Sequence, residues 1–185
     1  MENLSVKIIS QLSDNYCYAI YEKEHSSSIV IDPAEAENII YYLIEKKLNL
    51  EYIFITHHHS DHTSGVLDLV KEYPEVKIYS PSDLATLSTN KISHDDKIKT
   101  SINEFEIISA PGHTLDHIIL CDHKNNFLFV GDVLFRLGCG RIFEGTYEQM
   151  QTSLQKILNL SDDLTVYCGH EYTKNNLKFL EQIFD

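Results

Sequence analysis

Four side chains that commonly bind metal ions lie within the short segment Thr56-His57-His58-His59-Ser60-Asp61-His62. In extended chain, residues i and i+2 point the same way, so His57 and His59 can converge on one ion. Asp61 and His62 follow where the chain turns into a helix, and they face a second point nearby. A solvated histidine-rich loop is the alternative, but an Asp-His pair at this offset after a strand disfavours it. The pattern HxHxDH therefore predicts two adjacent metal sites.

Three further candidate ligands follow predicted strands, each directly after a glycine: His113, Asp132 and His170. Glycine lets the backbone approach a metal centre closely. Each of the three alone would be an ordinary turn or capping residue. Combined with the first motif, they provide ligands for two ions. The first ion would be bound by His57, His59 and His113, and the second by Asp61, His62 and His170. Asp132 would bridge the two ions. Nitrogen and carboxylate ligands suit zinc, iron or manganese.

Alternating strands and helices must position these ligands. Apolar runs predict strands at 6–9, 16–21, 28–31, 52–55, 77–79, 105–109, 118–121, 127–130 and 164–168. Helical patterns occupy 35–47, 64–73, 146–158 and 174–184, the third opening on a capping box at Thr146. Residues 81–103 are polar and irregular and receive no assignment. Two similar halves of this kind favour a layered α/β sandwich with helices outside, in a single domain over residues 1–185.

Composition restricts the class of protein. The 185 residues are 43% hydrophobic and 23% charged, with a formal net charge of −13, typical of a globular protein. Such a charge repels phosphate backbones and argues against nucleic-acid binding. No apolar run approaches membrane-spanning length, and the start lacks a signal-peptide pattern, so we expect a cytoplasmic protein without a membrane partner. The four cysteines show no CxxC spacing and are expected to be reduced core residues, with Cys168 a weaker candidate for a place behind the site.

The motifs THHHSDHTSG (56–65), PGHT (111–114), GD (131–132) and GH (169–170), in this order, resemble the metallo-β-lactamase superfamily. Three segments are similar to one branch, glyoxalase II or hydroxyacylglutathione hydrolase: 14–16 (DNY), 138–146 (GCGRIFEGT) and 169–173 (GHEYT). The resemblance implies a four-layered αββα sandwich with two metals at the sheet edge, and it agrees with the ligand division above.

The same resemblance implies an activity and a substrate. The expected reaction is hydrolysis of a glutathione thioester such as S-lactoylglutathione, the second step of methylglyoxal detoxification. Two divalent ions would take part, with zinc preferred over iron or manganese, and Asp61 and Asp132 would orient the attacking water. Arg141, the backbone around Phe143, and Tyr172 would contact the glutathione moiety. A structural salt bridge is the alternative for Arg141, and simple packing is the alternative for Tyr172.

Glyoxalase II enzymes usually continue into a C-terminal helical domain that supplies further basic contacts to glutathione. This sequence stops at Asp185, where that domain would begin. We therefore expect a complete metal site and a substrate site that lacks this wall. Three alternatives follow: a short thioesterase that is less specific for glutathione, a wall supplied by another subunit, or a truncated chain. The sequence does not indicate an oligomeric state.

Other functions share parts of the pattern. A persulfide dioxygenase of the same superfamily uses one iron held by two histidines and an aspartate, whereas Asp61, His62 and His170 together favour two ions. A nuclease shares HxHxDH but conflicts with the acidic charge, and a β-lactamase lacks the GCGR segment. Two further alternatives are a hydrolase of another thioester or phosphodiester and a metal-bound module without catalysis.

The other histidines are not predicted to be ligands. His58 is predicted to lie behind the ligands. The remaining histidines have no ligand context and are expected in surface or core positions: His25, His94, His117 and His123.

Overall fold

The first half of the chain forms a mixed sheet. The computed structural model describes residues 4–22, 24–84 and 89–184. Within them, the first sheet has the order β1-β2-β3-β4-β5-β6, in which β1 to β3 are antiparallel and β3 to β6 are parallel. Its strands are β1 (Leu4–Gln11), β2 (Asn15–Glu22), β3 (Ser27–Ile31), β4 (Asn49–Phe54), β5 (Lys77–Ser80) and β6 (Asn90–Lys91).

The second half forms another sheet, in the order β13-β10-β9-β8-β7. Only the β13–β10 pair is parallel among its described strands. The strands are β7 (Lys97–Lys99), β8 (Glu104–Ser109), β9 (Ile118–Asp122), β10 (Phe127–Gly131) and β13 (Thr165–Cys168), and a separate hairpin pairs β11 (Leu134–Phe135) with β12 (Gly138–Cys139). Because β8, β10 and β13 run in the same direction, their carboxyl ends meet at one edge.

Alternate residues of the central strands enter different hydrophobic layers. In β2, Tyr18 and Ile20 face the space between the sheets, whereas Cys17 and Ala19 face the helices beside the first sheet. In β10, Phe129 enters the space between the sheets and its neighbours face the opposite side. The period-two placement of side chains thus buries both faces of each sheet.

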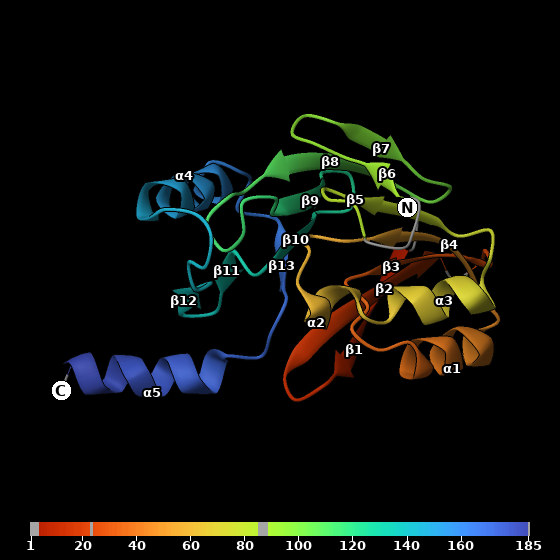
Figure 1. Cartoon of the computed structure of the whole chain (residues 1–185), viewed down its shortest axis with the longest axis horizontal. Coiled ribbons are helices and arrows are strands. Elements are labelled where there is room, and N and C mark those ends of the chain that lie inside the picture. Colours follow the sequence, from red (N-terminus) through yellow and green to blue (C-terminus); the bar gives the residue numbers. More distant parts are fainter. Residues whose placement is uncertain (1–3, 23, 85–88, 185) are drawn as a thin grey trace.

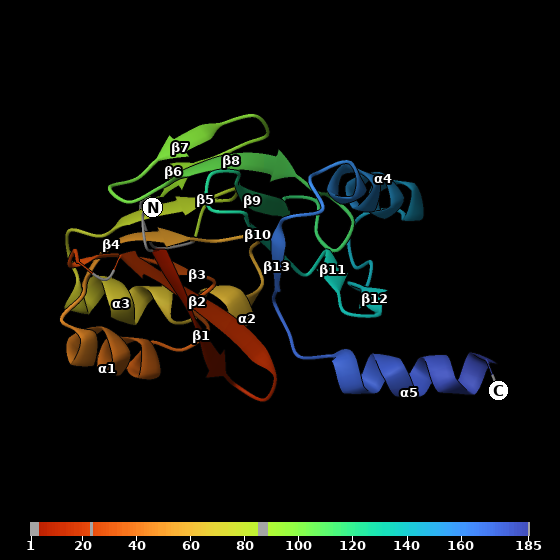
Figure 2. The same cartoon turned by 180° about the vertical axis from the view of Figure 1, so that it is seen from behind.

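Helices cover the two outer faces. The described helices are α1 (Glu37–Lys46), α2 (Ser60–Thr63), α3 (Val66–Glu72), α4 (Tyr147–Leu158) and α5 (Thr173–Phe184). Helices α1 and α3 lie against the first sheet and α4 packs on the second, whereas α5 extends away from the sandwich (Figures 1 and 2). This arrangement confirms the predicted αββα sandwich. Of the helices that the structure describes, none has the length and apolar character needed to cross a lipid bilayer.

Local sequence signals account for most of the elements. The capping box is present: Gln149 N donates to Thr146 Oγ1 at 3.2 Å, and Thr146 N donates to Gln149 Oε1 at 2.8 Å. The helix predicted over 64–73 is present as α3, and a separate short helix that was not predicted, α2, precedes it inside the histidine motif. The unassigned 81–103 region contains the short strands β6 and β7, and its residues 85–88 lie outside the described residues. The β11–β12 hairpin was not predicted because two-residue strands carry no periodicity.

The space between the sheets should contribute strongly to stability. Phe54 is fully buried, stacks on Tyr79 at 5.1 Å and meets Phe105 edge-on at 5.1 Å. We expect Phe54→Ala to lower the free energy of unfolding by about 3–5 kcal/mol, since it leaves a cavity between two sheets. Urea denaturation measures the loss. The control Tyr41→Ala, at a residue that is 72% exposed, should change it by less than about 0.5 kcal/mol. Equal losses in the two variants would contradict this assignment of the core.

Candidate metal centre

The three histidines predicted for the first ion lie together at the edge where the strands end. The ligand nitrogens of His57, His59 and His113 lie within 4.8 Å of one another. His59 Nδ1 is 3.1 Å from His57 Nε2 and 3.0 Å from His113 Nε2. His57 and His113 are buried, whereas His59 is half-buried in the wall of a pocket. The three imidazoles could share one cation.

The second predicted group is also assembled. The ligand atoms of Asp61, His62 and His170 lie within 4.8 Å of one another. Asp61 Oδ2 is 3.4 Å from His170 Nε2 and 3.7 Å from His62 Nε2. The two groups adjoin, because the rings of His57 and His62 have centroids only 4.3 Å apart.

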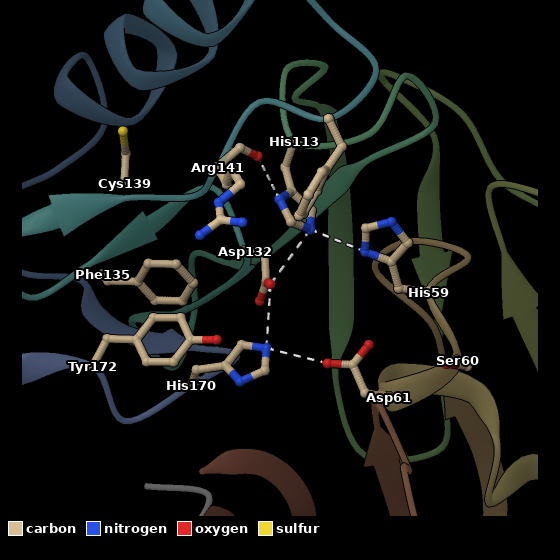
Figure 3. A pocket seen from close by; sticks show the side chains of 11 residues that line it. His59, Ser60, Asp61, His113, Asp132, Phe135, Cys139, Arg141, His170 and Tyr172 are labelled. Atoms are coloured by element: carbon tan, nitrogen blue, oxygen red, sulfur yellow. Dashed lines mark hydrogen bonds and ion pairs between the residues drawn. The ribbon is translucent and has the colours of Figure 1, made fainter. Parts of the chain in front are cut away.

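Asp132 lies between the two groups (Figure 3). Its Oδ2 is 3.5 Å from His113 Nε2 and 3.2 Å from His170 Nε2, and its Oδ1 is 3.5 Å from His62 Nε2. One carboxylate therefore contacts a histidine of the first group and two histidines of the second. This is the place that a bridging ligand would occupy.

Two polar atoms at the centre fit a bound cation. Among the described residues, His62 Nε2 and Asp132 Oδ1 are buried without any hydrogen-bond partner. A buried polar atom without a partner costs free energy that a coordinated ion would recover. The backbone also approaches closely here: a Cβ on Gly131, whose φ is +47°, would lie 2.6 Å from Thr56 Oγ1, and one on Gly169 would collide with Asp132. Gly112 differs, because a Cβ there would lie 2.9 Å from Met150 of α4 and not against the ligand cluster.

A second layer of contacts orients the imidazoles. The Nδ1 atoms of four histidines each contact a protein oxygen, which leaves Nε2 directed at the centre. The contacts are His57 to Thr56 Oγ1 (3.0 Å), His62 to Asp32 Oδ2 (3.1 Å), His113 to Arg141 O (2.7 Å) and His170 to Asp14 Oδ1 (2.8 Å). Oxygen partners of this kind fix the tautomer and the ring plane of metal-binding histidines.

Sequence reasoning missed several of these supporting residues. Asp32 directly follows the buried strand β3 and accepts hydrogen bonds from the backbone N and the hydroxyl of Thr56, just after the neighbouring strand β4. His117, expected merely in a surface or core position, is buried and its Nε2 accepts a hydrogen bond from the backbone N of Asp132 at 3.1 Å. Asn15 donates to Asp61 Oδ2 at 3.0 Å. An aspartate that closes a buried strand next to the motif was the available signal for Asp32.

The charges of the cluster are coupled. Burial, reinforced by neighbouring histidines, lowers the pKa of His57 well below its ordinary value. Burial alone would lower the pKa of His62 too, but the hydrogen bond and charge of Asp32, followed by the charges of Asp132 and Asp61, raise it to about 9. Burial opposes ionisation of Asp132, yet its histidine neighbours lower its pKa. A cation that binds here must therefore displace a proton from His62.

A pocket of about 940 Å³ opens over the cluster, and the predicted substrate residues Arg141, Phe143 and Tyr172 also line it. Tyr172 stacks on His170 at 4.8 Å with an angle of 8° between the rings, and burial, followed by nearby carboxylates, raises its pKa to about 12. Arg141 Cζ lies 5.6 Å from the ring centre of Phe143. No acidic side chain in the described parts of the chain forms an ion pair with Arg141, so the salt-bridge alternative finds no support.

The remaining sequence expectations have mixed outcomes. Cys139 is exposed and lines the pocket, so it is not the core residue that was expected. Cys168 is half-buried with its Sγ 3.3 Å from His170 O, behind the site. The surface histidines contact nearby acids, for example His123 Nε2 to Glu106 Oε2 at 3.2 Å.

Comparison with known proteins agrees with this geometry. The metallo-beta-lactamase superfamily model matches residues 12–170. A hydroxyacylglutathione hydrolase of Pseudoalteromonas translucida is 43% identical over 181 residues, which are 97% of this chain and 70% of the relative. A hydroxyacylglutathione hydrolase of Vibrio campbellii is 45% identical over 95% of this chain and 69% of its own length.

A solved structure extends the similarity to the fold. The crystal structure of ETHE1 from Myxococcus xanthus has a TM-score of 0.80 and 28% sequence identity, covering 91% of this chain and 76% of that chain.

Metal affinity should depend on pH in a defined direction. Because the raised pKa keeps His62 protonated below about 9, protons compete with the cation, and affinity should increase from pH 6 to pH 9. Asp32→Asn should lower the pKa of His62, so that affinity stops increasing at a lower pH. It should also weaken binding about 10- to 100-fold at pH 9. Zinc titration of metal-free protein against a competing chelator measures both.

The matched control is Asp68→Asn, which changes an exposed carboxylate paired with Lys71 at 2.7 Å and should leave the profile unchanged. An Asp32→Asn profile that coincides with that of the unmodified protein would exclude this role of Asp32.

Proposed function

The chain belongs to the metallo-β-lactamase superfamily and, within it, to the hydroxyacylglutathione hydrolase family, and we propose that it hydrolyses 2-hydroxyacyl thioesters of glutathione. S-Lactoylglutathione is the representative substrate, and lactate and glutathione are the products. The observation that carries the proposal is the ligand cluster in a pocket that Arg141 also lines. The relatives at 43% and 45% identity support the thioester as the bond that is cleaved.

The proposed cofactor is a pair of divalent cations, zinc first and iron or manganese as alternatives. The proposed ligands of one ion are His57, His59 and His113, and those of the other are Asp61, His62 and His170, with Asp132 shared. Bound there, the cations would supply a water with a pKa near 7 and a Lewis acid for the thioester carbonyl. The nitrogen and oxygen donor set suits zinc well.

The residues of the chain position the reactants. Asp61 and Asp132 line the pocket, where their carboxylates can accept hydrogen bonds from the attacking water and hold it against the carbonyl carbon. Asn15 keeps Asp61 in place. The departing group is a thiolate, whose conjugate acid has a pKa of about 8.5, so no side chain needs to protonate it.

Arg141 supplies a positive charge to the pocket of a chain whose net charge is −13. Its planar guanidinium can form two parallel hydrogen bonds with a glutathione carboxylate. Phe143 flanks it, and Tyr172 closes the pocket beside His170. These residues are the proposed contacts of the glutathione moiety.

Steady-state hydrolysis of S-lactoylglutathione, with the metal content of the same preparation, tests the proposal. We expect saturable turnover and close to two divalent ions per chain. Asp132→Ala should lose the turnover and the bound ions, because it removes a ligand common to the two groups. The exposed Asp163→Ala is the control and should keep both. One iron per chain without thioester hydrolysis would instead favour the persulfide dioxygenase, and an active Asp132→Ala enzyme would exclude the bridging role.

The role of Arg141 predicts a specific kinetic change. Arg141→Ala should raise KM about 10- to 100-fold, the range for a lost hydrogen bond to a charged group, with little change in kcat because the carboxylate is remote from the reacting bond. Arg141→Lys should recover part of the loss, since it keeps the charge without the planar fork. Arg136→Ala, at an exposed arginine of the β11–β12 turn, should leave KM unchanged. A fall in kcat alone for Arg141→Ala would contradict the assignment.

A further inference from the structure

Three segments form the rim of the pocket, and two of them are joined through the backbone. The segments are 56–60, 111–117 and 140–145. Phe143 N donates to His113 O at 3.2 Å, Gly145 N donates to Gly112 O at 3.1 Å, and His113 Nδ1 lies 2.7 Å from Arg141 O. Figure 3 shows the last of these contacts, which places Arg141 beside His113. The segment that carries Arg141 is thus anchored to the segment that carries His113.

His58 connects the remaining segment to both of the others. Its neighbours His57 and His59 point into the ligand cluster, whereas His58 points out of it toward two acids. His58 Nδ1 is 2.9 Å from Asp116 Oδ1, and His58 Nε2 is 3.2 Å from Glu144 Oε1. Both ring nitrogens are therefore engaged, one with each of the other two segments.

The two acids are themselves held in position. Asp116 Oδ1 accepts a hydrogen bond from Thr114 Oγ1 at 2.6 Å, and Asp116 Oδ2 accepts one from the Ser82 hydroxyl. Glu144 Oε2 accepts a hydrogen bond from the backbone N of Leu115 at 2.9 Å. Partners that are already ordered reduce the entropy lost when His58 binds them. A contact with such ordered partners can restrain a loop, whereas an ion pair between two flexible surface side chains contributes little.

The position of Glu144 makes the contact relevant to the substrate. Glu144 directly follows Phe143, whose ring meets His113 at 5.3 Å and His59 at 5.7 Å. Phe143 in turn supports the guanidinium of Arg141. Movement of Glu144 would therefore move the wall that is proposed to bind glutathione.

We propose that His58 is a positioning residue, whose simultaneous contacts with Asp116 and Glu144 fix the Arg141–Phe143 wall at the correct distance from the metal ligands. The inference rests on the proposed thioester hydrolysis. The unit formed by His58, Asp116 and Glu144 sets the affinity for the glutathione moiety, and it takes no part in bond cleavage.

The test is a double-mutant cycle with His58→Ala and Glu144→Ala, assayed with S-lactoylglutathione in zinc-containing buffer, with metal content determined for each variant. Glu144→Ala should raise KM about three- to tenfold, within the range of coupling between contacting residues, with kcat changed by less than about twofold. The double variant should be no worse than the worse single variant. Glu144→Gln should recover most of the wild-type KM, because its amide can still meet both Leu115 N and His58.

A general loss of structure would lower the active fraction and hence kcat, so the rise in KM at constant kcat separates positioning from stability. His123→Ala is the matched control. It removes another exposed histidine–glutamate contact of 3.2 Å, at the opposite end of β9 from the site, and should leave KM unchanged.

Several results would overturn the inference. One is that the effects of the single variants on KM multiply in the double variant. Another is a fall in kcat at unchanged KM. A third is loss of bound metal in Glu144→Ala, which would make the acids ligands of an ion. A wild-type protein that hydrolyses the thioester while Glu144→Ala keeps the wild-type KM would refute this inference alone. A wild-type protein with two metals and no thioester hydrolysis would refute the proposed function and this inference with it.

Discussion

Five imidazoles and two carboxylates, most of them buried, lie together at the sheet edge, where two of their atoms have no hydrogen-bond partner among the described residues. Such a cluster is costly in a metal-free protein, because burial disfavours charge and the polar atoms lose water. Cations recover that cost only if the ligands are already directed at common points. Much of the surrounding structure can be understood as meeting this requirement.

Both sheets contribute to it. Parallel strands place several chain ends at one edge, so ligands from positions 57 to 170 converge although they are far apart in sequence. The two sheets are joined beside the cluster, where Tyr16 N donates to Gly169 O and Glu171 N donates to Asp14 O, each at 2.8 Å. Oxygens behind the cluster then select which ring nitrogen is directed inward. The contacts that hold the two sheets together therefore also fix the positions of the ligands.

Charge explains how an acidic chain can accept an acidic ligand. The surface as a whole repels anions at a net charge of −13. Bound cations would reverse the local potential in the pocket, and Arg141, which also lines it, contributes a further positive charge. The relatives that share 41–45% identity are longer than this chain, which covers about 70% of them. Within the shared part, the pocket that Arg141 lines is the proposed place for a glutathione carboxylate.

The sequence by itself determined the elements and the ligand types. Alternating apolar residues predicted the longer strands, Thr146 and Gln149 predicted the start of α4, and HxHxDH with three glycine-preceded ligands predicted two adjoining ion positions. These signals are local, so spacing alone reveals them. Only the tertiary structure decided which residues support the ligands. Asp32 meets His62 across 30 positions, Asp14 meets His170 across 156, and Glu144 meets His58 across the pocket rim. No local period encodes such partners, because Asp32 and His62 meet through the pairing of β3 with β4, and the other two contacts depend on how the two halves of the chain pack together.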